Sequence, residues 1–423
     1  MRRIVKNTIL KYLPSDFQLE NNVQPERIFD FNNKPIKNGI VVYFCNREIR
    51  CKDNFALQFA LKKSQELDLP LKIIIPHFSF EQKSKQNFIN RQIITAGKCF
   101  KNAGLDFEIF VEGSLINYLN KINTALLITD FNPIENKNFL DNADFKIYET
   151  DSHNIVPTRF ASNKQEYNAA TYRRKIYGNI FKFLTEFPNI TTEKTKADLV
   201  LQDFIKNKLQ YYAEFKNNPV KNVSSGLSVY LNLGFISSQR VALEAVKSDV
   251  SDENKEAFLE ELIVRKELAD NFCLHCKDFK TFDCISQWAK NSLNAHKNDI
   301  RGYLYSLEDF EQAKTHDKLW NATQNQLKTE GKIHGYLRMY WAKKISEWTQ
   351  SPQEALNFAI YLNDKYAYDA PSPNGYVGIL WAIGALHDRA FKDYFVTGKI
   401  RRMTLKSLKT KFDIFKYIKN FSK

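Results

Sequence analysis

The chain has 423 residues, of which 43% are hydrophobic, so it can fill the cores of two or three ordinary domains. No window approaches the roughly 20 consecutive apolar residues of a membrane span, and the first residues lack the apolar stretch of a signal peptide, so we exclude a membrane protein and expect an intracellular one. Lysine and arginine outnumber aspartate and glutamate by 62 to 48, and the net charge of +14 points equally to a polyanionic partner such as nucleic acid and to plain solubility.

The first half of the chain alternates short, apolar, β-branched segments with amphipathic segments of helical length. The predicted strands are residues 39–44, 71–78, 106–113, 125–131 and 145–151. Predicted helices at 54–68 and 88–104 separate the first three strands. Apolar strands separated by helices are typical of a parallel sheet covered on both faces. We therefore predict a doubly wound α/β domain over residues 38–165, preceded by an arm at 1–37.

Neither a dinucleotide site nor a nucleoside triphosphate site is signalled, because no GxGxxG or GxxxxGK[ST] follows any strand. Residues 166–200 are polar and basic, and we predict an interdomain linker there. Beyond the linker the 3.6-residue period dominates. The predicted helices are residues 237–247, 255–271, 284–295, 306–315, 317–330, 336–349, 352–364 and 375–385. Ser237, Ser251 and Ser351 suit N-cap positions, and we predict an all-helical domain over residues 201–423.

The six cysteines are few for this length and show no disulfide-framework spacing, which suits a reducing compartment. Cys273, His275, Cys276 and Cys284 together offer four ligands of the kind that zinc prefers. Zinc fingers, however, place their ligands on short turns, whereas this cluster continues a helical run. We therefore expect buried, inert thiols here and no metal site.

The segment at 334–348, HGYLRMYWAKKISEW, combines an arginine, two lysines and two tryptophans on one predicted helix. At 3.6 residues per turn, Trp341 and Trp348 lie on the same helix face, roughly 10 Å apart. Two indoles along one helix serve either core packing or electron transfer. The usual burial of tryptophan favours core packing when this segment is taken alone.

Six segments in order resemble the class II cyclobutane pyrimidine dimer photolyases, and the similarity covers nearly the whole chain from about Val41 onward. The segments are residues 150–167, 224–237, 258–273, 315–327, 334–348 and 361–391. The resemblance implies the photolyase and cryptochrome fold, an α/β domain followed by a helical FAD-binding domain. It also implies that light drives electron transfer from reduced FAD to a cyclobutane dimer in UV-damaged DNA. The alternatives are a cryptochrome-like photoreceptor of the same fold and, from charge alone, a cofactor-free DNA-binding protein.

The resemblance assigns cofactor roles one residue at a time. The residues that match the loop and helix start holding the FAD phosphates are Ser224, Ser225, Leu227 and Ser228. Free backbone N–H groups and a helix dipole at such a place suit an anion. Arg338 and Asp369 match the ion pair beside the isoalloxazine ring, and Asn363 matches the side chain near flavin N5.

The resemblance also assigns residues to the lesion. Glu261 matches the glutamate that hydrogen-bonds the pyrimidine C4 carbonyl, a role that requires burial to keep the carboxyl protonated. The positions that line or flank the lesion pocket and engage DNA are matched by Met339, Trp381, Arg389, Phe391 and Arg401. The dimer must leave the duplex to meet the flavin, so base flipping is implied. We expect a monomer that binds UV-damaged DNA, in the nucleus of a eukaryote or in the cytoplasm, associated with the nucleoid, of a bacterium or archaeon.

Trp341, Trp320 and Trp348 match the tryptophans that carry electrons inward in the family, and Tyr305 is an additional candidate donor. A second, antenna chromophore of the deazaflavin type is a further expectation for the α/β domain, although no short motif identifies it. The chain departs from the family pattern at four matched positions. Val229, Asn232 and Leu233 replace the usual Pro, His and Phe, and Phe391 replaces a Trp. We expect these changes to loosen the cofactor site and weaken DNA binding without abolishing either.

Overall fold

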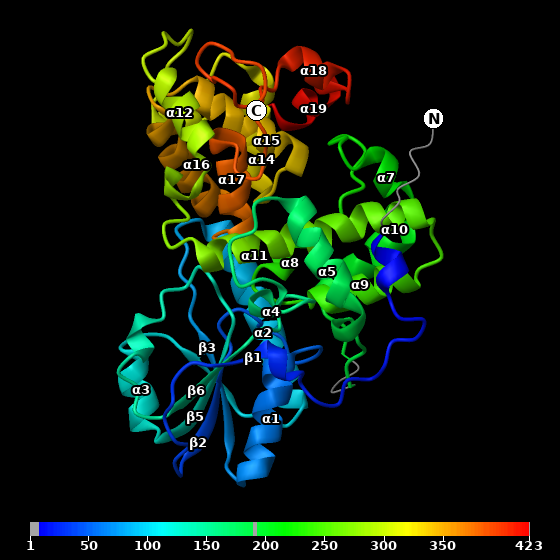
Figure 1. Ribbon diagram of the computed structural model, residues 1–423, viewed down its shortest axis with the longest axis vertical. Helices are drawn as coiled ribbons and strands as arrows, with labels where there is room; N and C mark the ends of the chain where they lie inside the picture. The colour runs from blue at the N-terminus through cyan, green and yellow to red at the C-terminus, as the bar shows by residue number, and fades with distance from the viewer. Residues whose placement is uncertain (1–7, 189–192, 423) are drawn as a thin grey trace.

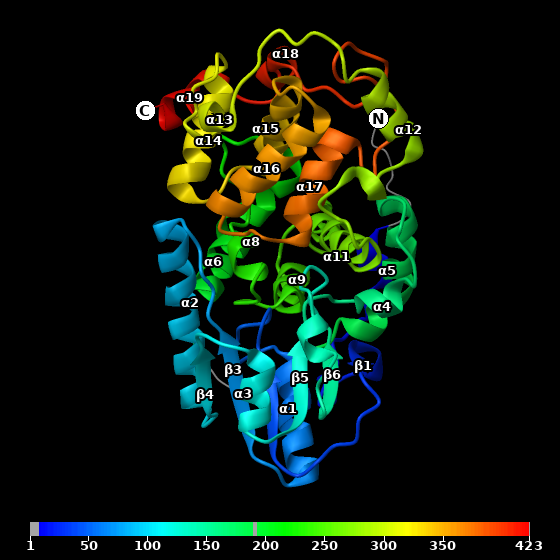
Figure 2. The same ribbon diagram turned by 90° about the vertical axis from the view of Figure 1, so that its left-hand side faces the viewer.

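The chain forms two stacked parts, one built on a β-sheet and one made of helices (Figures 1 and 2). The structure is a computed structural model that describes residues 8–188 and 193–422. Residues 1–7 of the predicted arm, residues 189–192 of the predicted linker and Lys423 lie outside the described residues.

Six strands form the sheet. They are β1 (Ile28–Asp30), β2 (Ile40–Phe44), β3 (Leu71–Pro76), β4 (Phe107–Phe110), β5 (Thr124–Asp130) and β6 (Lys146–Thr150). Their order is β1-β6-β5-β2-β3-β4, and every neighbouring pair is parallel except β1 with β6. All five predicted strands are present. The antiparallel edge strand β1 is an addition contributed by the predicted arm.

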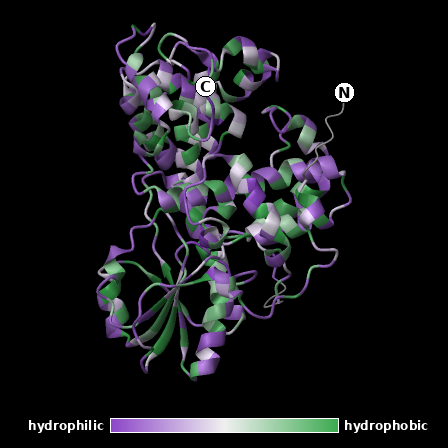
Figure 3. Cartoon of the chain, in the orientation of Figure 1, coloured by the Kyte–Doolittle hydropathy of each residue, from purple (hydrophilic) through white to green (hydrophobic). Residues whose placement is uncertain are grey.

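Both faces of the sheet are buried, because successive side chains of a strand point to opposite sides. Val41 and Tyr43 of β2 join the core that contains α1 (Phe55–Leu67) and α2 (Lys83–Asn102). Val42 and Phe44 join a separate core beneath α3 (Leu115–Lys121). Figure 3 shows the strands as the most continuously hydrophobic elements of this part. The predicted doubly wound α/β architecture is confirmed.

The helical part follows the predicted order. Its helices are α4 (Thr158–Ala161), α5 (Ala169–Phe183), α6 (Lys196–Asp203), α7 (Tyr212–Phe215), α8 (Ser228–Leu231), α9 (Ser238–Lys247), α10 (Asp252–Leu259), α11 (Lys266–His275), α12 (Gln287–Ala295), α13 (Leu307–Glu311), α14 (Lys318–Glu330), α15 (Gly335–Glu347), α16 (Pro352–Tyr366), α17 (Pro373–Gly384), α18 (Leu405–Lys409) and α19 (Ile414–Phe421). Each predicted helical segment contains a helix. Among residues 8–188 and 193–422, none of the helices has the length and apolarity needed to cross a bilayer.

The predicted helix at 255–271 is not one regular helix. A π-helical segment, Glu260–Arg265, joins α10 to α11. Such wide turns re-aim the side chains that follow them and are frequent at functional sites. The segment predicted as a linker also differs from expectation, because α5 occupies much of it and buries a stripe of apolar residues in the first core. That core continues as far as Leu268 on α11, so the two parts of the chain share it.

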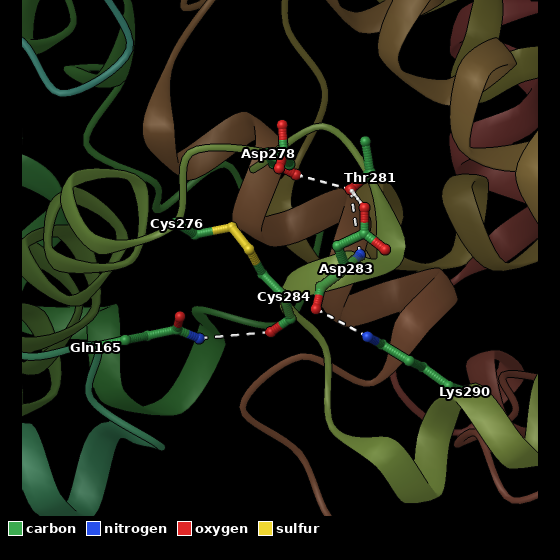
Figure 4. The surroundings of a disulfide bond; sticks show 7 residues. All are labelled: Gln165, Cys276, Asp278, Thr281, Asp283, Cys284 and Lys290. Atoms are coloured by element: carbon green, nitrogen blue, oxygen red, sulfur yellow. Dashed lines mark hydrogen bonds between the residues drawn. A yellow bond between two sulfur atoms is a disulfide. The ribbon is translucent and has the colours of Figure 1, made fainter.

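Cys276 and Cys284 form a disulfide, and their Cα atoms lie 6.2 Å apart (Figure 4). The prediction of inert thiols is therefore wrong for these two residues, whereas Cys273 is a free, buried thiol. The chain leaves α11 after His275 and turns back through a loop in which the Thr281 hydroxyl donates to the Asp278 carbonyl, at 3.0 Å. This turn brings the two sulfur atoms together, so neither thiolate is available to zinc. Within the described residues, no group of three or more metal-ligating side chains exists.

Candidate active site

A cavity of about 220 Å³ lies where α8, the π-helical segment and the start of α17 meet. Its wall contains several residues that the sequence predicts as site residues: Ser225, Ser228, Glu261 and Asp369. They come from separate stretches of the chain, so folding brings them together. The wall also contains Arg47, His153, Lys266 and Asp270, which the sequence did not single out.

Arg338 on α15 contacts the cavity wall through Asp369, although neither Arg338 nor Asn363 lines the cavity itself. Its Nη2 atom forms an ion pair with Asp369, at 3.1 Å to Oδ1, and its Nη1 atom donates to Asn363 Oδ1 at 3.2 Å. Burial raises the pKa of the Asp369 carboxyl, but the Arg338 guanidinium, the Ser228 hydroxyl and Lys332 outweigh burial and bring the pKa below its ordinary value. Asp369 is therefore ionised at neutral pH, and it holds Arg338 in one orientation.

Asn363 on α16 is held from two sides. Its Nδ2 atom donates to Asp364 Oδ1 at 3.0 Å, while its Oδ1 atom accepts from Arg338. A Cβ atom added to Gly375, in the first turn of α17, would lie 3.0 Å from Asn363 Nδ2 and 3.2 Å from the Ser372 hydroxyl oxygen. The absence of a side chain at Gly375 thus lets α17 approach the amide closely.

The predicted phosphate loop is a tight turn at the edge of the cavity. Gly226 has a φ of +75°, a conformation that favours glycine. Ser225 Oγ accepts from the Leu227 N–H at 3.3 Å, and the helix that follows, α8, has only four residues. Ser228 is the first residue of α8, as the resemblance implies, but a helix of four residues supplies little dipole. A positive charge that the sequence did not reveal compensates, since Lys332 Nζ lies 3.7 Å from the place of a Cβ on Gly226.

Buried charges join the two parts of the molecule along the cavity wall. Arg47, just after β2, donates from Nη2 to Asp270 Oδ1 on α11 at 2.8 Å, and both side chains are at most 3% exposed. Asp270 Oδ2 is buried without a hydrogen-bond partner among the described residues. Beside this pair, Lys266 donates to the His153 carbonyl at 2.9 Å. The place of Arg47 at the carboxyl end of a parallel strand, where ligands bind such sheets, is the signal that would have found it.

Glu261 lies on the π-helical segment at the mouth of the cavity. The role that the resemblance assigns to Glu261 depends on burial, and in this structure its side chain is 47% exposed, with its Oε1 atom 3.1 Å from Lys216 Nζ. The side chain remains in contact with the cavity that Ser228 and Asp369 line.

The residues predicted to flank the lesion lie outside the lining of this cavity. Trp381 on α17 is partly buried, with Lys343 Nζ 4.7 Å from its ring centroid, and Met339 on α15 packs against the same core. Two arginines contact the Phe391 ring, with guanidinium carbons 5.4 Å (Arg389) and 4.6 Å (Arg401) from its centroid. Arg389 also lines a second, wider depression of about 520 Å³, together with Arg173, Arg265 and Trp288.

The tryptophans form a continuous array in the core. Trp320 on α14 stacks on Trp341, with ring centroids 6.4 Å apart and planes 5° apart, and contacts Trp348 at 6.3 Å. Trp320 therefore lies between the two indoles that the sequence places on one helix face. The array is fixed by hydrogen bonds, because Trp320 Nε1 donates to the Trp341 carbonyl at 3.0 Å and Trp341 Nε1 donates to Gln324 Oε1 at 2.9 Å. Tyr305 extends it, 6.0 Å from Trp348.

Several solved structures share this fold, although their sequences are distant. A cryptochrome from a Synechocystis species aligns with a TM-score of 0.70 at 14% identity, covering 92% of this chain and 89% of its own. A class III photolyase from Agrobacterium tumefaciens aligns with a TM-score of 0.68 at 16% identity, covering 92% of this chain and 88% of its own. Likeness at such low identity shows the fold alone.

Curated relatives are much closer in sequence, although no family model matches the chain. A deoxyribodipyrimidine photo-lyase from Potorous tridactylus is 34% identical over all of this chain and 89% of its own length. A protein of the same name from Arabidopsis thaliana is 36% identical over 90% of this chain and 88% of its own. Another, from Methanothermobacter thermautotrophicus, is 31% identical over 94% of this chain and 98% of its own length. The chain belongs to the deoxyribodipyrimidine photo-lyase family.

Proposed function

We propose that this protein is a light-dependent DNA repair lyase of the class II type, which splits cyclobutane pyrimidine dimers. The proposal depends on one arrangement of side chains, found in a chain that belongs to the photo-lyase family. Arg338, Asn363 and Asp369 form a hydrogen-bonded set, and Asp369 lies in the same cavity wall as the Ser225 turn and Glu261.

The cavity residues fit FAD by their chemistry. The Ser225–Gly226 turn and Lys332 offer hydroxyl, backbone and ammonium donors to a diphosphate. Asp270 Oδ2 is a buried acceptor without a partner in the described chain, and it suits a ligand N–H or O–H group. The side chains of Arg338 and Asn363 offer polar groups that suit the nitrogen and oxygen atoms of an isoalloxazine ring. The chemistry that bound, reduced FAD supplies is an electron delivered to the dimer after light absorption.

The chain's own residues receive the lesion. Glu261 lies at the mouth of the cavity, where a flipped dimer would cover it, and burial then favours the protonated carboxyl that donates to a pyrimidine carbonyl. Arg389 and Arg401 with Phe391 form an exposed cationic and aromatic edge that suits DNA phosphates and unstacked bases. We propose that the protein acts as a monomer, in a nucleus or at a nucleoid, where its DNA substrate is found.

The aromatic array supplies electrons to the cofactor site. Trp348, Trp320 and Trp341 pass electrons inward in that order, since each neighbouring pair is in ring contact and Trp341 lies about one turn from Arg338 on α15. Tyr305 is the donor to Trp348, on the strength of the 6.0 Å ring contact. Core packing and electron transfer are compatible here, because rigid, buried indoles serve both.

A second chromophore of the deazaflavin type has a suitable place in the α/β part. A cavity of about 270 Å³ lies beyond the carboxyl ends of β2, β3 and β5, and Phe78, Phe80, Asn46 and Asn132 contribute to its wall. Ligands of parallel sheets bind at this end of the strands. A solved archaeal photolyase from Sulfolobus tokodaii, similar in fold, is described with two FAD molecules, with the implication of a novel light-harvesting cofactor.

Two measurements on purified protein test the proposal. The visible absorbance spectrum should show flavin bands, and a colourless protein would refute the flavoenzyme. An oligonucleotide with one defined dimer should be repaired to two unmodified pyrimidines under blue light and should remain unrepaired in darkness. Flavin bands without repair would favour the photoreceptor alternative.

A further inference from the structure

Beyond the tryptophans, Tyr305 and His316 make a two-point contact. The backbone N–H of His316 donates to Tyr305 Oη at 2.9 Å, and Tyr305 Oη lies 2.8 Å from His316 Nδ1. While Oη accepts the backbone N–H, its own proton can be donated to Nδ1. This arrangement suits an imidazole that carries its hydrogen on Nε2 and offers Nδ1 as an acceptor.

The same pair is fixed against the outer tryptophan. The backbone N–H of Tyr305 donates to the Trp348 carbonyl at 3.0 Å, and the His316 ring lies 4.7 Å from the Trp348 ring, edge to face. Tyr303 stacks on His316, with ring centroids 3.6 Å apart, and is itself 50% exposed. The aromatic contacts thus run without a gap from buried Trp341 to an exposed tyrosine.

We propose, building on the electron route of the proposed function, that Tyr305 and His316 act together as a proton-coupled terminal electron donor. When Trp348 is oxidised, Tyr305 gives it one electron, the Tyr305 O–H bond breaks, and the proton passes to His316 Nδ1. The products are neutral Trp348, a neutral tyrosyl radical and an imidazolium ion. His316 is exposed and releases the proton to water, and a one-electron reductant of the thiol class, with a proton, restores the phenol.

The histidine matters because a phenol has an ordinary pKa of about 10 and gives up its proton at neutral pH only when oxidised. With a base in contact, electron and proton leave together, and return of the electron requires the proton to return as well. The groups that face His316 are Asp317 on its own segment, Lys344 on α15, paired with Glu347 at 2.5 Å, and the two tyrosines. Although His316 reaches water, partial desolvation of its ring and the charge of Lys344 lower the pKa of His316 against the opposing effect of Asp317, so the ring is a neutral base at pH 7.

Transient absorption of the flavin-loaded, oxidised protein tests this inference. In the wild type, the tryptophan radical should decay into a tyrosyl radical, more slowly in D₂O and more slowly as the pH falls through the pKa of His316. In His316→Gln, which keeps the size and polarity but lacks the base, tyrosyl formation should slow by about 10²-fold. Tyr303→Phe is the matched control, because its ring still stacks on His316, and it should leave the rate of Tyr305 oxidation unchanged. Equal rates in the wild type and His316→Gln would overturn the proposal.

A measurement in the dark separates this inference from the proposed function. Nitrogen-15 NMR of His316 should show hydrogen on Nε2 in the wild type and a mixed tautomer in Tyr305→Phe. Hydrogen on Nδ1 in the wild type would overturn the proton transfer whatever the flavin content. A protein without flavin would refute the proposed function, and the tautomer would still decide whether Nδ1 accepts the tyrosine proton.

Discussion

Replacing Asp369 by asparagine should destabilise the helical part of the protein by about 3 kcal/mol. The Arg338 and Asp369 side chains are only 19% and 13% exposed, so Asp369→Asn leaves a largely buried guanidinium without its counter-charge. Breaking a buried pair in this way costs about 3–5 kcal/mol, and the partial exposure of Arg338 favours the lower end. With a denaturant slope of about 3 kcal/mol per molar urea, the unfolding midpoint should fall by about 1 M.

Tryptophan fluorescence during urea unfolding provides the assay, because all five tryptophans lie between residues 288 and 381. Both proteins must carry the same amount of flavin, since a bound ligand adds its own stability. The matched control is Asp144→Asn, whose partner Lys37 lies at 2.8 Å but whose pair is 46% and 69% exposed, and it should not shift the midpoint. Equal midpoints and slopes for Asp369→Asn and the wild type would refute the buried ion pair.

The pH dependence of the difference in unfolding free energy between the wild type and Asp369→Asn provides a second test of the ion pair. The native pKa of Asp369 lies below its ordinary value, because Arg338, the Ser228 hydroxyl and Lys332 outweigh burial. The contribution of the pair is therefore complete above the unfolded pKa of about 4 and is lost as the pH falls through the lower native pKa. Wild type and Asp369→Asn should differ at pH 7 and converge only below about pH 4. A constant difference down to pH 2 would contradict this assignment.

Three further substitutions test the site. Glu261→Ala should lower the quantum yield of repair by about tenfold or more while flavin absorbance stays unchanged, and an unchanged yield would remove its role. Trp341→Phe should prevent photoreduction of oxidised flavin yet spare repair after chemical reduction, and retained photoreduction would place the electron route elsewhere. Gly375→Ala should push the Asn363 amide away and cost about 1–3 kcal/mol in urea unfolding, because its Cβ would lie 3.0 Å from Nδ2. A wild-type midpoint for Gly375→Ala would show that α16 and α17 separate without cost.

Local sequence signals predicted much of the fold. The alternating strands and helices of the first half appear with bounds shifted by a few residues. Ser237 accepts from the N–H groups of Gln239 and Arg240, and Ser351 accepts from that of Glu354, as N-cap serines do. Ser251 also precedes a helix, but its hydroxyl accepts from the side chain of a nearby asparagine instead. Signals of this kind act within a few residues, which is why a single sequence reveals them.

Some features that the sequence did not predict depend on tertiary contacts. Others depend on an apolar helical period that the charged residues between its members hide. Tyr172, Ile176, Ile180 and Phe183 form the buried stripe of α5, but arginine and lysine residues between them gave the segment the composition of a linker. The Arg47–Asp270 pair joins residues that are 223 positions apart, so no local pattern announces it. The resemblance placed Arg338, Asn363 and Asp369 correctly as neighbours, because family motifs preserve contacts that spacing alone does not reveal.

The most direct test of the central claim is repair of a single defined cyclobutane dimer by the purified, reduced protein. Under blue light, the dimer should be converted to two unmodified pyrimidines, and no conversion should occur in darkness or with protein stripped of flavin. Flavin-loaded, reduced protein that binds the damaged oligonucleotide but leaves the dimer intact under illumination would contradict the claim.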